Sequence, residues 1–239
     1  MKKFLHKGLL VPLCLCLLCL LTGCTLLLYS GAHSSPALQY HLQGSTLSAL
    51  KNGHLLWKRQ LPEVDRQFPS SLLAQGSVLY VATGPVYAFD ERNGALVWQR
   101  SIRYVDAFST SSQVADALSW DHDHLFAETT YNHIVALDSK NGALVWEYAA
   151  QDGLISPPAF STTGKRVYVE TMQLSNQAYY SVQALSEQNG TQLWQQMFRL
   201  AYHGEQHLAR PTFSHGVISV QMGGKQAVFD TTESVIALR

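Results

Sequence analysis

The chain has no cysteine after residue 24, and this lack is the first constraint on what it can be. Only four of its 239 residues are cysteine, and all four lie in the N-terminal segment, as Cys14, Cys16, Cys19 and Cys24. The rest of the chain therefore contains no disulfide and no cysteine ligand for a metal. Cys16 and Cys19 have the spacing of a redox pair, but they fall inside an apolar run. We interpret them as small hydrophobic residues.

Charge is also scarce and shows no excess of one sign. Charged residues make up 14% of the chain, with 17 basic against 17 acidic residues. Three of the basic residues, Lys2, Lys3 and Lys7, lie at the N-terminus, so the remainder carries 14 basic against 17 acidic residues. Because a nucleic-acid-binding protein needs an excess of Lys and Arg, this composition argues against one. The 46% of hydrophobic residues is enough to build a core and argues against a disordered chain.

The N-terminal segment has the layout of an export signal. The basic start is followed by an apolar run over residues 9–21, as in a secretory signal. The run ends in Leu21-Thr22-Gly23-Cys24, which resembles the lipobox of a bacterial lipoprotein signal. The resemblance implies cleavage before Cys24 and a lipid on its thiol. It predicts a signal peptide over residues 1–23 and a linker over residues 24–36.

Two other fates remain open for this segment. The residues that follow Cys24 stay apolar, so the apolar stretch extends over 20 residues, 9–28, which is long enough to span a bilayer as a helix. The segment could therefore stay as an uncleaved anchor over residues 9–29, or it could be cleaved and the protein released. All three fates place the remainder outside the cytoplasm, and the first two attach it to the cell membrane.

The rest of the chain is a tandem repeat marked by tryptophan. Four of the five tryptophans recur at intervals of 41, 48 and 48 residues, and each follows an Asn-Gly pair. A period of about 45 residues indicates a repeat architecture. The residues that recur at fixed positions, which we interpret as structural, are Trp57, Trp98, Trp146, Trp194, Gly53, Gly94, Gly142, Gly190, Asp90 and Asp138.

Each repeat is predicted to hold hairpins of short strands. Residues 86–90 alternate with the period of a strand, and Asp90 is placed to cap the turn that follows. Asn93 or Gly94 is expected to take the left-handed conformation that closes a type I turn with a bulge. The first copy is shorter in this turn, which predicts a tight Asn52-Gly53 hairpin. A second hairpin precedes each of these, so one repeat contains four strands.

Four short strands in a repeat of this length predict the blade of a β-propeller. The motif Ala-x-Asp-x-x-x-Gly-x-x-x-Trp, complete at residues 88–98 and 136–146, resembles the PQQ-like, or quinoprotein-type, propeller repeat. The resemblance covers about residues 37–239 and implies an all-β fold in which the tryptophan docks on a neighbouring blade. The competing WD40 repeat would require Trp-Asp pairs at the blade ends.

We expect a partial or open β-propeller of about four to five four-stranded blades. The predicted blades are three strands over about 37–60, full blades over about 66–100, 107–149 and 153–199, and an incomplete fifth blade. Aligning Ala237 with Ala184 places the next tryptophan beyond Arg239, so the fifth blade is expected to lack its last strand. Uncovered sheet faces and edges favour association, which predicts a second copy of the chain or another protein as partner.

No cluster of residues predicts a catalytic, cofactor or metal site. Asp121-His122-Asp123-His124, with His133 nearby, has the residue types of a metal site. It aligns, however, with the turn that joins two strands of the next repeat, and we interpret it as a solvated polar turn. His203 and His207 have the spacing of a zinc-binding helix, but Gly204 lies between them and the usual Glu is missing. We therefore expect no bound metal.

Quinone-dependent dehydrogenases share this propeller, so an enzyme fragment of that class is the alternative function. That resemblance implies a vicinal cysteine pair and a calcium site, and Glu128 with Glu170 alone cannot form one. Since a shared fold does not carry an active site, we expect no enzyme activity and no cofactor. We interpret the chain as an exported, membrane-tethered protein-binding or scaffold module, by analogy with a lipoprotein propeller that assists outer-membrane protein assembly. A truncated propeller without a role of its own is a further alternative.

Overall fold

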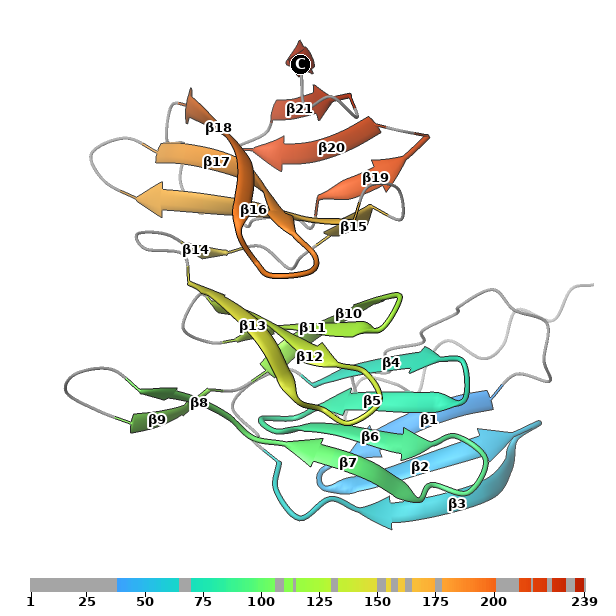
Figure 1. Ribbon diagram of the computed structural model, residues 1–239. Helices are drawn as coiled ribbons and strands as arrows, with labels where there is room; N and C mark the ends of the chain where they lie inside the picture. The colour runs from blue at the N-terminus through green and yellow to red at the C-terminus, as the bar shows by residue number, and fades with distance from the viewer. Residues whose placement is uncertain are drawn as a thin grey trace, which may run out of the picture. The chain divides into compact units, whose positions relative to one another are not determined.

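A computed structural model describes the repeat region strand by strand. The described residues are 38–64, 70–105, 110–113, 115–129, 133–149, 154–155, 159–161, 165–174, 178–200, 211–215, 217–222, 225–230 and 235–238. The expected signal or anchor, its Cys24, the linker over residues 24–36 and the segment 203–207 lie outside the described residues. Every described element is a β-strand (Figure 1). The described part of the chain accordingly contains no helix that is long and apolar enough to cross a membrane.

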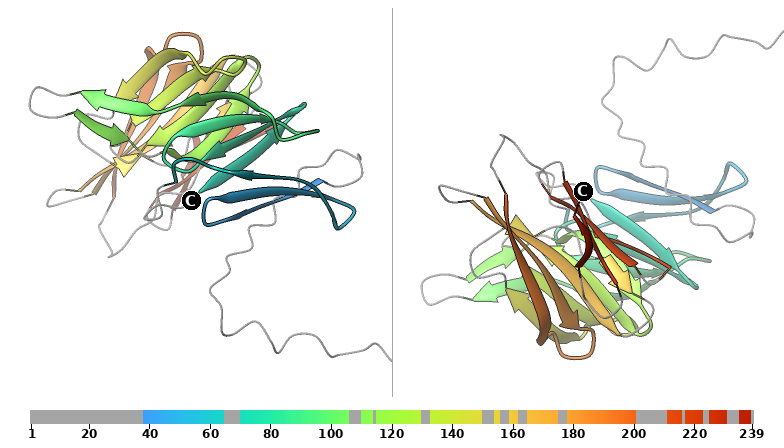
Figure 2. Two further views of the ribbon diagram at one scale, coloured as in Figure 1. Left: turned by 90° about the horizontal axis from the view of Figure 1, so that it is seen from below. Right: turned by 90° about the horizontal axis from the view of Figure 1, so that it is seen from above.

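Most strands belong to five antiparallel sheets that follow one another in chain order, here called blades 1 to 5 (Figures 1 and 2). Blade 1 consists of β1 (Leu38–Gln43), β2 (Thr46–Lys51) and β3 (His54–Gln60). Blade 2 consists of β4 (Ser71–Gln75), β5 (Val78–Ala82), β6 (Val86–Asp90) and β7 (Leu96–Arg100). Blade 3 consists of β10 (Ala115–Asp121), β11 (His124–Thr129), β12 (His133–Asp138) and β13 (Leu144–Ala149).

The last two blades repeat the same meander with changes in strand length. Blade 4 consists of β14 (Leu154–Ile155), β15 (Ala159–Ser161), β16 (Arg166–Leu174), β17 (Ala178–Ser186) and β18 (Gln192–Leu200). Both β14 and β15 pair with β16, so the first strand of this blade is split in two. Blade 5 consists of β19 (Thr212–Ser214), β20 (Val217–Met222), β21 (Lys225–Phe229) and β22 (Val235–Leu238). These sheets confirm the expected all-β fold, a partial or open propeller of PQQ-like blades.

The expectation that blade 5 lacks its last strand is wrong, because β22 is present and pairs with β21. Ala237 pairs with Val228 across a bulge, the register in which Trp194 pairs with Ala184 in blade 4. Ala237 thus occupies the tryptophan position and not that of Ala184. The alignment failed because β16 and β17 have nine residues each, whereas β20 has six and β21 has five. The residue spacing between equivalent positions of blades 4 and 5 before this hairpin therefore does not apply to residues after it.

A small hairpin between blades 2 and 3 was not predicted from the sequence. It pairs β8 (Ile102–Val105) with β9 (Thr110–Gln113) in a separate two-stranded sheet. Only Ser101 separates β7 from β8, so the chain runs from the last strand of blade 2 directly into the hairpin (Figure 1). A strand that continues past its own sheet carries no turn signal in the sequence, which is why the hairpin was missed.

The hydrophobic core lies in layers between neighbouring blades. In β6, Val86 and Ala88 belong to a cluster shared with blade 3, whereas Tyr87 and Phe89 belong to a cluster shared with blade 1. Both faces of this strand are therefore buried, which explains its unbroken apolar sequence. Four such clusters join blades 1 and 2, 2 and 3, 3 and 4, and 4 and 5. Among the described residues, no cluster joins blade 1 to blade 5.

Candidate functional site at the joints between blades

Each joint is built on the turn between the last two strands of a blade. In blade 3 the Asp138 carboxylate accepts hydrogen bonds from the backbone N–H groups of Lys140 (2.8 Å) and Asn141 (3.1 Å). Gly142 follows with φ of +71° and donates its N–H to the Asp138 carbonyl (2.8 Å). Its glycine takes the left-handed position, as the Asn-Gly sequence predicted.

The corresponding turns of blades 1 and 2 also follow the sequence. Gly94 has φ of +67°, and the Asp90 carboxylate accepts the N–H of Arg92 (2.9 Å). Hydrogen bonds from Arg92 lower the pKa of Asp90 to about 2. In blade 1, Asn52 and Gly53 both have positive φ, +53° and +78°. This is the tight two-residue hairpin that the shorter first copy predicted.

Three tryptophans lie directly on glycines of the following blade. Their side chains are only 6–8% exposed. A Cβ atom added to any of the three glycines would come within 2.6–2.7 Å of an indole carbon, which is closer than atoms can approach. The docked pairs are Trp57 on Gly94, Trp98 on Gly142 and Trp146 on Gly190. Glycine is therefore required here for two reasons, the left-handed backbone and the absence of a side chain.

Each of these indoles also donates a hydrogen bond across the joint. The acceptor is a backbone carbonyl in the turn of the next blade, and the distances are 2.7, 3.0 and 2.6 Å for the three pairs. The pairs are Trp57 with Glu91, Trp98 with Ser139 and Trp146 with Glu187. Trp194, at the fourth repeat position, packs edge-on against Phe229 of blade 5 at 5.2 Å. Packing and a polar contact thus coincide at the same side chain.

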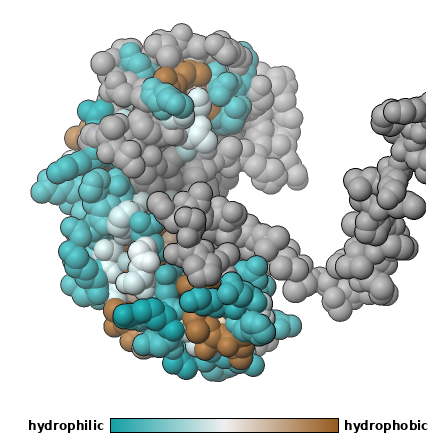
Figure 3. Space-filling model, turned by 90° about the vertical axis from the view of Figure 1, so that its right-hand side faces the viewer, coloured by the Kyte–Doolittle hydropathy of each residue, from teal (hydrophilic) through white to brown (hydrophobic). Residues whose placement is uncertain are grey.

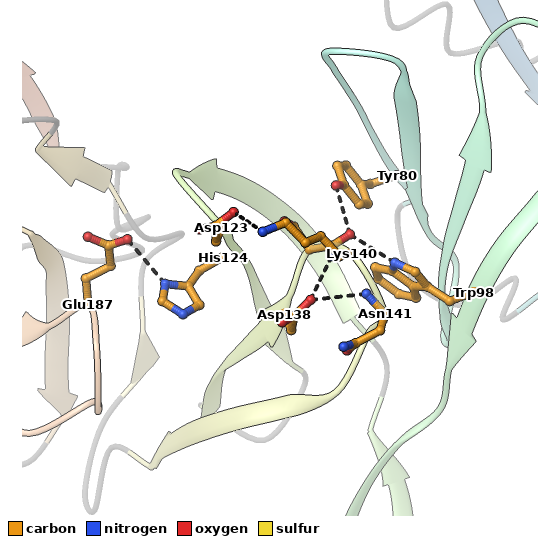
Figure 4. A network of polar contacts seen from close by, with 9 residues as sticks. Tyr80, Trp98, Asp123, His124, Asp138, Lys140, Asn141 and Glu187 are labelled. Carbon is orange, nitrogen blue, oxygen red and sulfur yellow. Dashed lines mark hydrogen bonds and ion pairs between the residues drawn. The ribbon is translucent and has the colours of Figure 1, made fainter.

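An aromatic residue completes each joint. It lies on the second strand of a four-stranded blade, and on the equivalent strand β1 of the three-stranded blade 1. Tyr40 and Tyr80 occupy equivalent positions, each pairing with the alanine that faces the blade's tryptophan. The Tyr40 hydroxyl donates to Glu91 Oε1 (2.8 Å) and the Tyr80 hydroxyl to the carbonyl of Ser139 (3.2 Å). Figure 4 shows Tyr80 and Trp98 converging on one turn of blade 3. Burial raises the pKa of both hydroxyls, and Glu91 adds to the effect at Tyr40.

The joint between blades 3 and 4 differs, because its aromatic residue is Phe126. Phe126 has no hydroxyl to donate, and Glu187, at the position of Glu91, meets histidine instead. His124 Nδ1 lies 3.2 Å from Glu187 Oε1, and the two side chains face each other in Figure 4. His122 Nδ1 lies 3.9 Å from the same oxygen and 2.7 Å from Asp121 Oδ1.

The predicted polar turn is present between β10 and β11, but it is not uniformly solvated. Asp121 is only 4% exposed, and its Oδ2 atom is buried without a hydrogen-bond partner. Burial, and after it the negative charge of Glu187, raise the pKa of Asp121. Asp123, by contrast, is solvated and pairs with Lys140 at 2.8 Å (Figure 4). His133, noted with this turn in the sequence, contacts Glu147 instead.

The sequence alone did not place Glu187 beside this turn, because Glu187 lies 63 residues after His124. A signal was available in the repeat: Glu187 occupies the same turn position as Glu91 and Ser139. Ligand atoms of Asp121, His122 and Glu187 lie within 4.8 Å of one another. Two carboxylates and an imidazole are groups that can ligate a metal ion.

Burial also shifts the acidity of Glu170 on β16. Its side chain is fully buried, and desolvation raises its pKa to about 8. Glu128 lies at the equivalent position of β11 and is only partly buried. In the strand register Glu170 pairs with Val182 and Glu128 with Ile134.

We expect the protein to lose stability as the pH rises from about 5 to 8, and Glu170→Gln to remove much of this loss. Glu170 is protonated in the folded protein up to about pH 8, whereas in the unfolded chain it ionises from its ordinary value of 4.5. Between these values the unfolded state binds fewer protons, so the free energy of unfolding falls by up to about 1.4 kcal/mol per pH unit. Urea unfolding at pH 5, 6.5 and 8 measures it. Equal pH slopes for wild type and variant would contradict the assignment.

A bulge on the last strand of each of blades 1 to 4 is accompanied by aliphatic side chains in solvent. In blade 2, Trp98 pairs with Ala88 and Leu96 with Phe89, so Val97 is an extra residue. Leu96 and Val97 are 54% and 51% exposed. The large exposed hydrophobic residues of β3, β7, β13 and β18, here called the edge-strand aliphatics, are Leu55, Leu56, Leu96, Val97, Leu144, Val145, Leu193 and Met197. Figure 3 shows one face of the protein, where hydrophobic residues form patches among hydrophilic ones.

Comparisons with known proteins agree with this geometry. Residues 82–239 match the family model described as outer membrane protein assembly factor BamB. No curated protein sequence matches the chain. A similar solved structure is that of BamB from Moraxella catarrhalis, with 21% identity, a TM-score of 0.58, and coverage of 84% of this chain and 63% of that one.

Two quinoprotein enzymes have a similar fold. The quinohemoprotein alcohol dehydrogenase ADHIIG from Pseudomonas putida HK5 has 14% identity and a TM-score of 0.62, covering 86% of this chain and 40% of that one. A europium-containing methanol dehydrogenase has 11% identity and a TM-score of 0.63, covering 84% and 48%. At these identities the likeness shows the fold, a propeller of PQQ-like repeats. The chain spans between 40% and 63% of the length of the three structures.

Proposed function

The chain belongs to the family of the outer membrane protein assembly factor BamB, and we propose that it is an exported, membrane-tethered propeller that binds a protein and catalyses no reaction. The observation that carries this proposal is the set of edge-strand aliphatics, which recur on the last strands of blades 1 to 4. On each of these strands two exposed large apolar side chains lie close together in the sequence, and exposed apolar patches favour protein docking. A bulge lies beside the exposed aliphatic pairs of blades 1 to 3 and beside Leu193 in blade 4, next to the tryptophan of the same strand.

Site-specific crosslinking tests the docking surface. A photo-crosslinking residue at Leu96 or Leu144 should give the same covalent product with one envelope protein in membranes. The matched control places it at Gln99, an exposed polar residue of the same strand as Leu96. Products that form equally from Gln99, or no product from any position, would contradict docking at these strands.

The partner is another protein or a second copy of the chain. The sequence argument for a second copy rested on the uncovered sheet flanks of an open arc, in which blade 1 lacks its first strand and blade 5 its last. The presence of β22 removes the second of these gaps, whereas blade 1 has three strands. Light scattering of the purified chain at several concentrations distinguishes the two. A mass that doubles with concentration supports a second copy, and a constant monomer mass supports a different partner protein.

Membrane tethering is proposed to depend on Cys24. Changing Cys24→Ser removes the thiol that the lipobox-like sequence would lipidate, so we expect an uncleaved precursor without lipid label. Radiolabelled palmitate and the mass of the chain report both changes. Cys19→Ser is the matched control, because it removes a thiol from the same apolar run. If wild type and Cys24→Ser show the same cleavage pattern and the same lipid label, Cys24 is not the lipidated residue. Residues 9–29 then act as an uncleaved anchor or as an ordinary signal.

The alternative function is that of a quinone-dependent dehydrogenase fragment, which the two dehydrogenase structures favour through their fold. It would require a bound quinone and calcium. We expect the purified protein to show no quinone absorbance after incubation with pyrroloquinoline quinone and Ca²⁺. A stoichiometric chromophore that persists through gel filtration would favour the enzyme.

A further inference from the structure

The turn of blade 3 and the turn of blade 4 bring two buried carboxylates together. Asp121 and Glu187 are each only 4% exposed. Their described ion-pair partners are His122 and His124, not lysine or arginine. Buried carboxylates are strongly destabilised unless a positive charge or several hydrogen-bond donors accompany them. Each imidazole approaches its carboxylate through one ring nitrogen, Nδ1, which can donate at most one hydrogen bond.

The equivalent joint between blades 1 and 2 satisfies its carboxylate in another way. Glu91 occupies the same turn position as Glu187 and accepts the hydroxyl of Tyr40 at 2.8 Å. Phe126 replaces that tyrosine in blade 3 and leaves the place beside Glu187 to imidazole and carboxylate groups. The cluster is thus a departure from the repeat and not a consequence of it.

We propose that Asp121, His122 and Glu187 bind one divalent transition-metal ion, with Zn²⁺ as the best fit, at the joint between blades 3 and 4. One ligand atom from each residue lies within 4.8 Å of the others. The unpartnered Oδ2 of Asp121 supplies an independent sign of a missing cation, because a carboxylate oxygen buried without a partner is rare. A divalent ion would neutralise both carboxylates at once.

The mixture of ligands selects the class of metal. Zn²⁺ accepts imidazole nitrogen and carboxylate oxygen, usually with four ligands, whereas Ca²⁺ and Mg²⁺ prefer oxygen alone. His124, whose Nδ1 lies 3.2 Å from Glu187 Oε1, stands beside the three ligands and orients the Glu187 carboxylate. Since the ligands come from two blades, the ion would link them as the docked tryptophan does.

Zinc titration of the full chain in detergent, after removal of metal by a chelator, tests this site. We expect one Zn²⁺ per chain and a rise in melting temperature on zinc addition. Asp121→Asn and Glu187→Gln each keep the shape of the side chain and remove a charged ligand. They should weaken the affinity by about tenfold or more. His122→Asn removes the imidazole but keeps a residue that tolerates the positive φ of +50° at this position.

Two control variants separate this site from other acidic groups. Asp123→Asn changes an exposed carboxylate of the same turn, and Glu91→Gln changes the equivalent joint of blade 2. Both should bind zinc as wild type does. All variants keep the four N-terminal cysteines, so zinc held by those thiols would survive in every one. Cobalt substitution reports the ligands directly, because Co²⁺ bound by nitrogen and oxygen gives visible bands without thiolate charge transfer.

The outcomes decide the proposal. Saturable zinc binding whose affinity falls by about tenfold or more in Asp121→Asn and Glu187→Gln and is unchanged in Asp123→Asn supports the site. The proposal is overturned if wild type binds no zinc, or if the binding is the same in all variants. Should Asp121→Asn fail to fold by circular dichroism, Glu187→Gln and His122→Asn decide instead. The crosslinking experiment on the edge-strand aliphatics is independent, so either proposal can fail alone.

Discussion

Replacing Gly142 with alanine should destabilise the protein much more than replacing Gly53 with alanine. Both glycines have positive φ, +71° and +78°, so both substitutions force alanine into the left-handed conformation at about 1–2 kcal/mol. At Gly142 the new Cβ would also lie 2.6 Å from Trp98 Cε3, whereas at Gly53 nothing lies within 4 Å. Overpacking adds about 1–3 kcal/mol. We therefore expect a total of about 2–5 kcal/mol for Gly142→Ala.

Urea unfolding followed by circular dichroism measures the difference between the two variants. Gly53→Ala is the matched control, because it shares the backbone strain and lacks the contact. Equal destabilisation of both variants would mean that Trp98 does not rest on Gly142. A loss at Gly142→Ala greater than that at Gly53→Ala by 1 kcal/mol or more supports the joint.

Removing the indole of Trp146 is the second change with a large expected effect. Trp146 is 7% exposed, packs with Phe126 at 5.7 Å, and donates its N–H to the carbonyl of Glu187. Trp146→Ala should cost about 3–5 kcal/mol, a large part of the 5–15 kcal/mol that stabilises a typical domain. We expect aggregation or a much lower melting temperature, measured by differential scanning calorimetry.

Leu144→Ala is the control for this change, because Leu144 lies on the same strand and is 45% exposed. It should alter the melting temperature little. Trp146→Phe should fall between the two, since it keeps an aromatic ring and loses the hydrogen bond to Glu187. A Trp146→Ala variant as stable as Leu144→Ala would show that the tryptophan contributes nothing to the joint.

Much of the repeat could be predicted because its turns are local. Asp138, Asn141 and Gly142 lie within five positions, and the conformation of each follows from its own backbone preferences. The alternation of small or aliphatic residues with aromatic residues along β6 likewise predicts a strand. The tryptophan stands out because large aromatic residues at a fixed place in a repeat are usually buried between neighbours.

The features that the sequence did not reveal depend on the lengths of intervening segments. The register of Ala237 depends on the hairpin of β20 and β21, which is shorter than the corresponding hairpin of β16 and β17 in blade 4. The glycine under each tryptophan lies in the following blade, so no local pattern pairs them. No local pattern predicts the contact between Asp121 and Glu187 either, because it requires two turns of different blades to lie side by side.

The double-mutant cycle of Trp98 and Gly142 tests the central claim most directly, that docked Trp–Gly joints hold the blades together. Unfolding free energies of wild type, Trp98→Ala, Gly142→Ala and the double variant give the coupling between the two positions. With the indole removed, the new Cβ at position 142 meets no ring and only the backbone strain remains. The double variant should therefore be less destabilised than the sum of the singles, by about 1 kcal/mol or more. Additivity within about 0.5 kcal/mol would contradict the joint and the blade packing built on it.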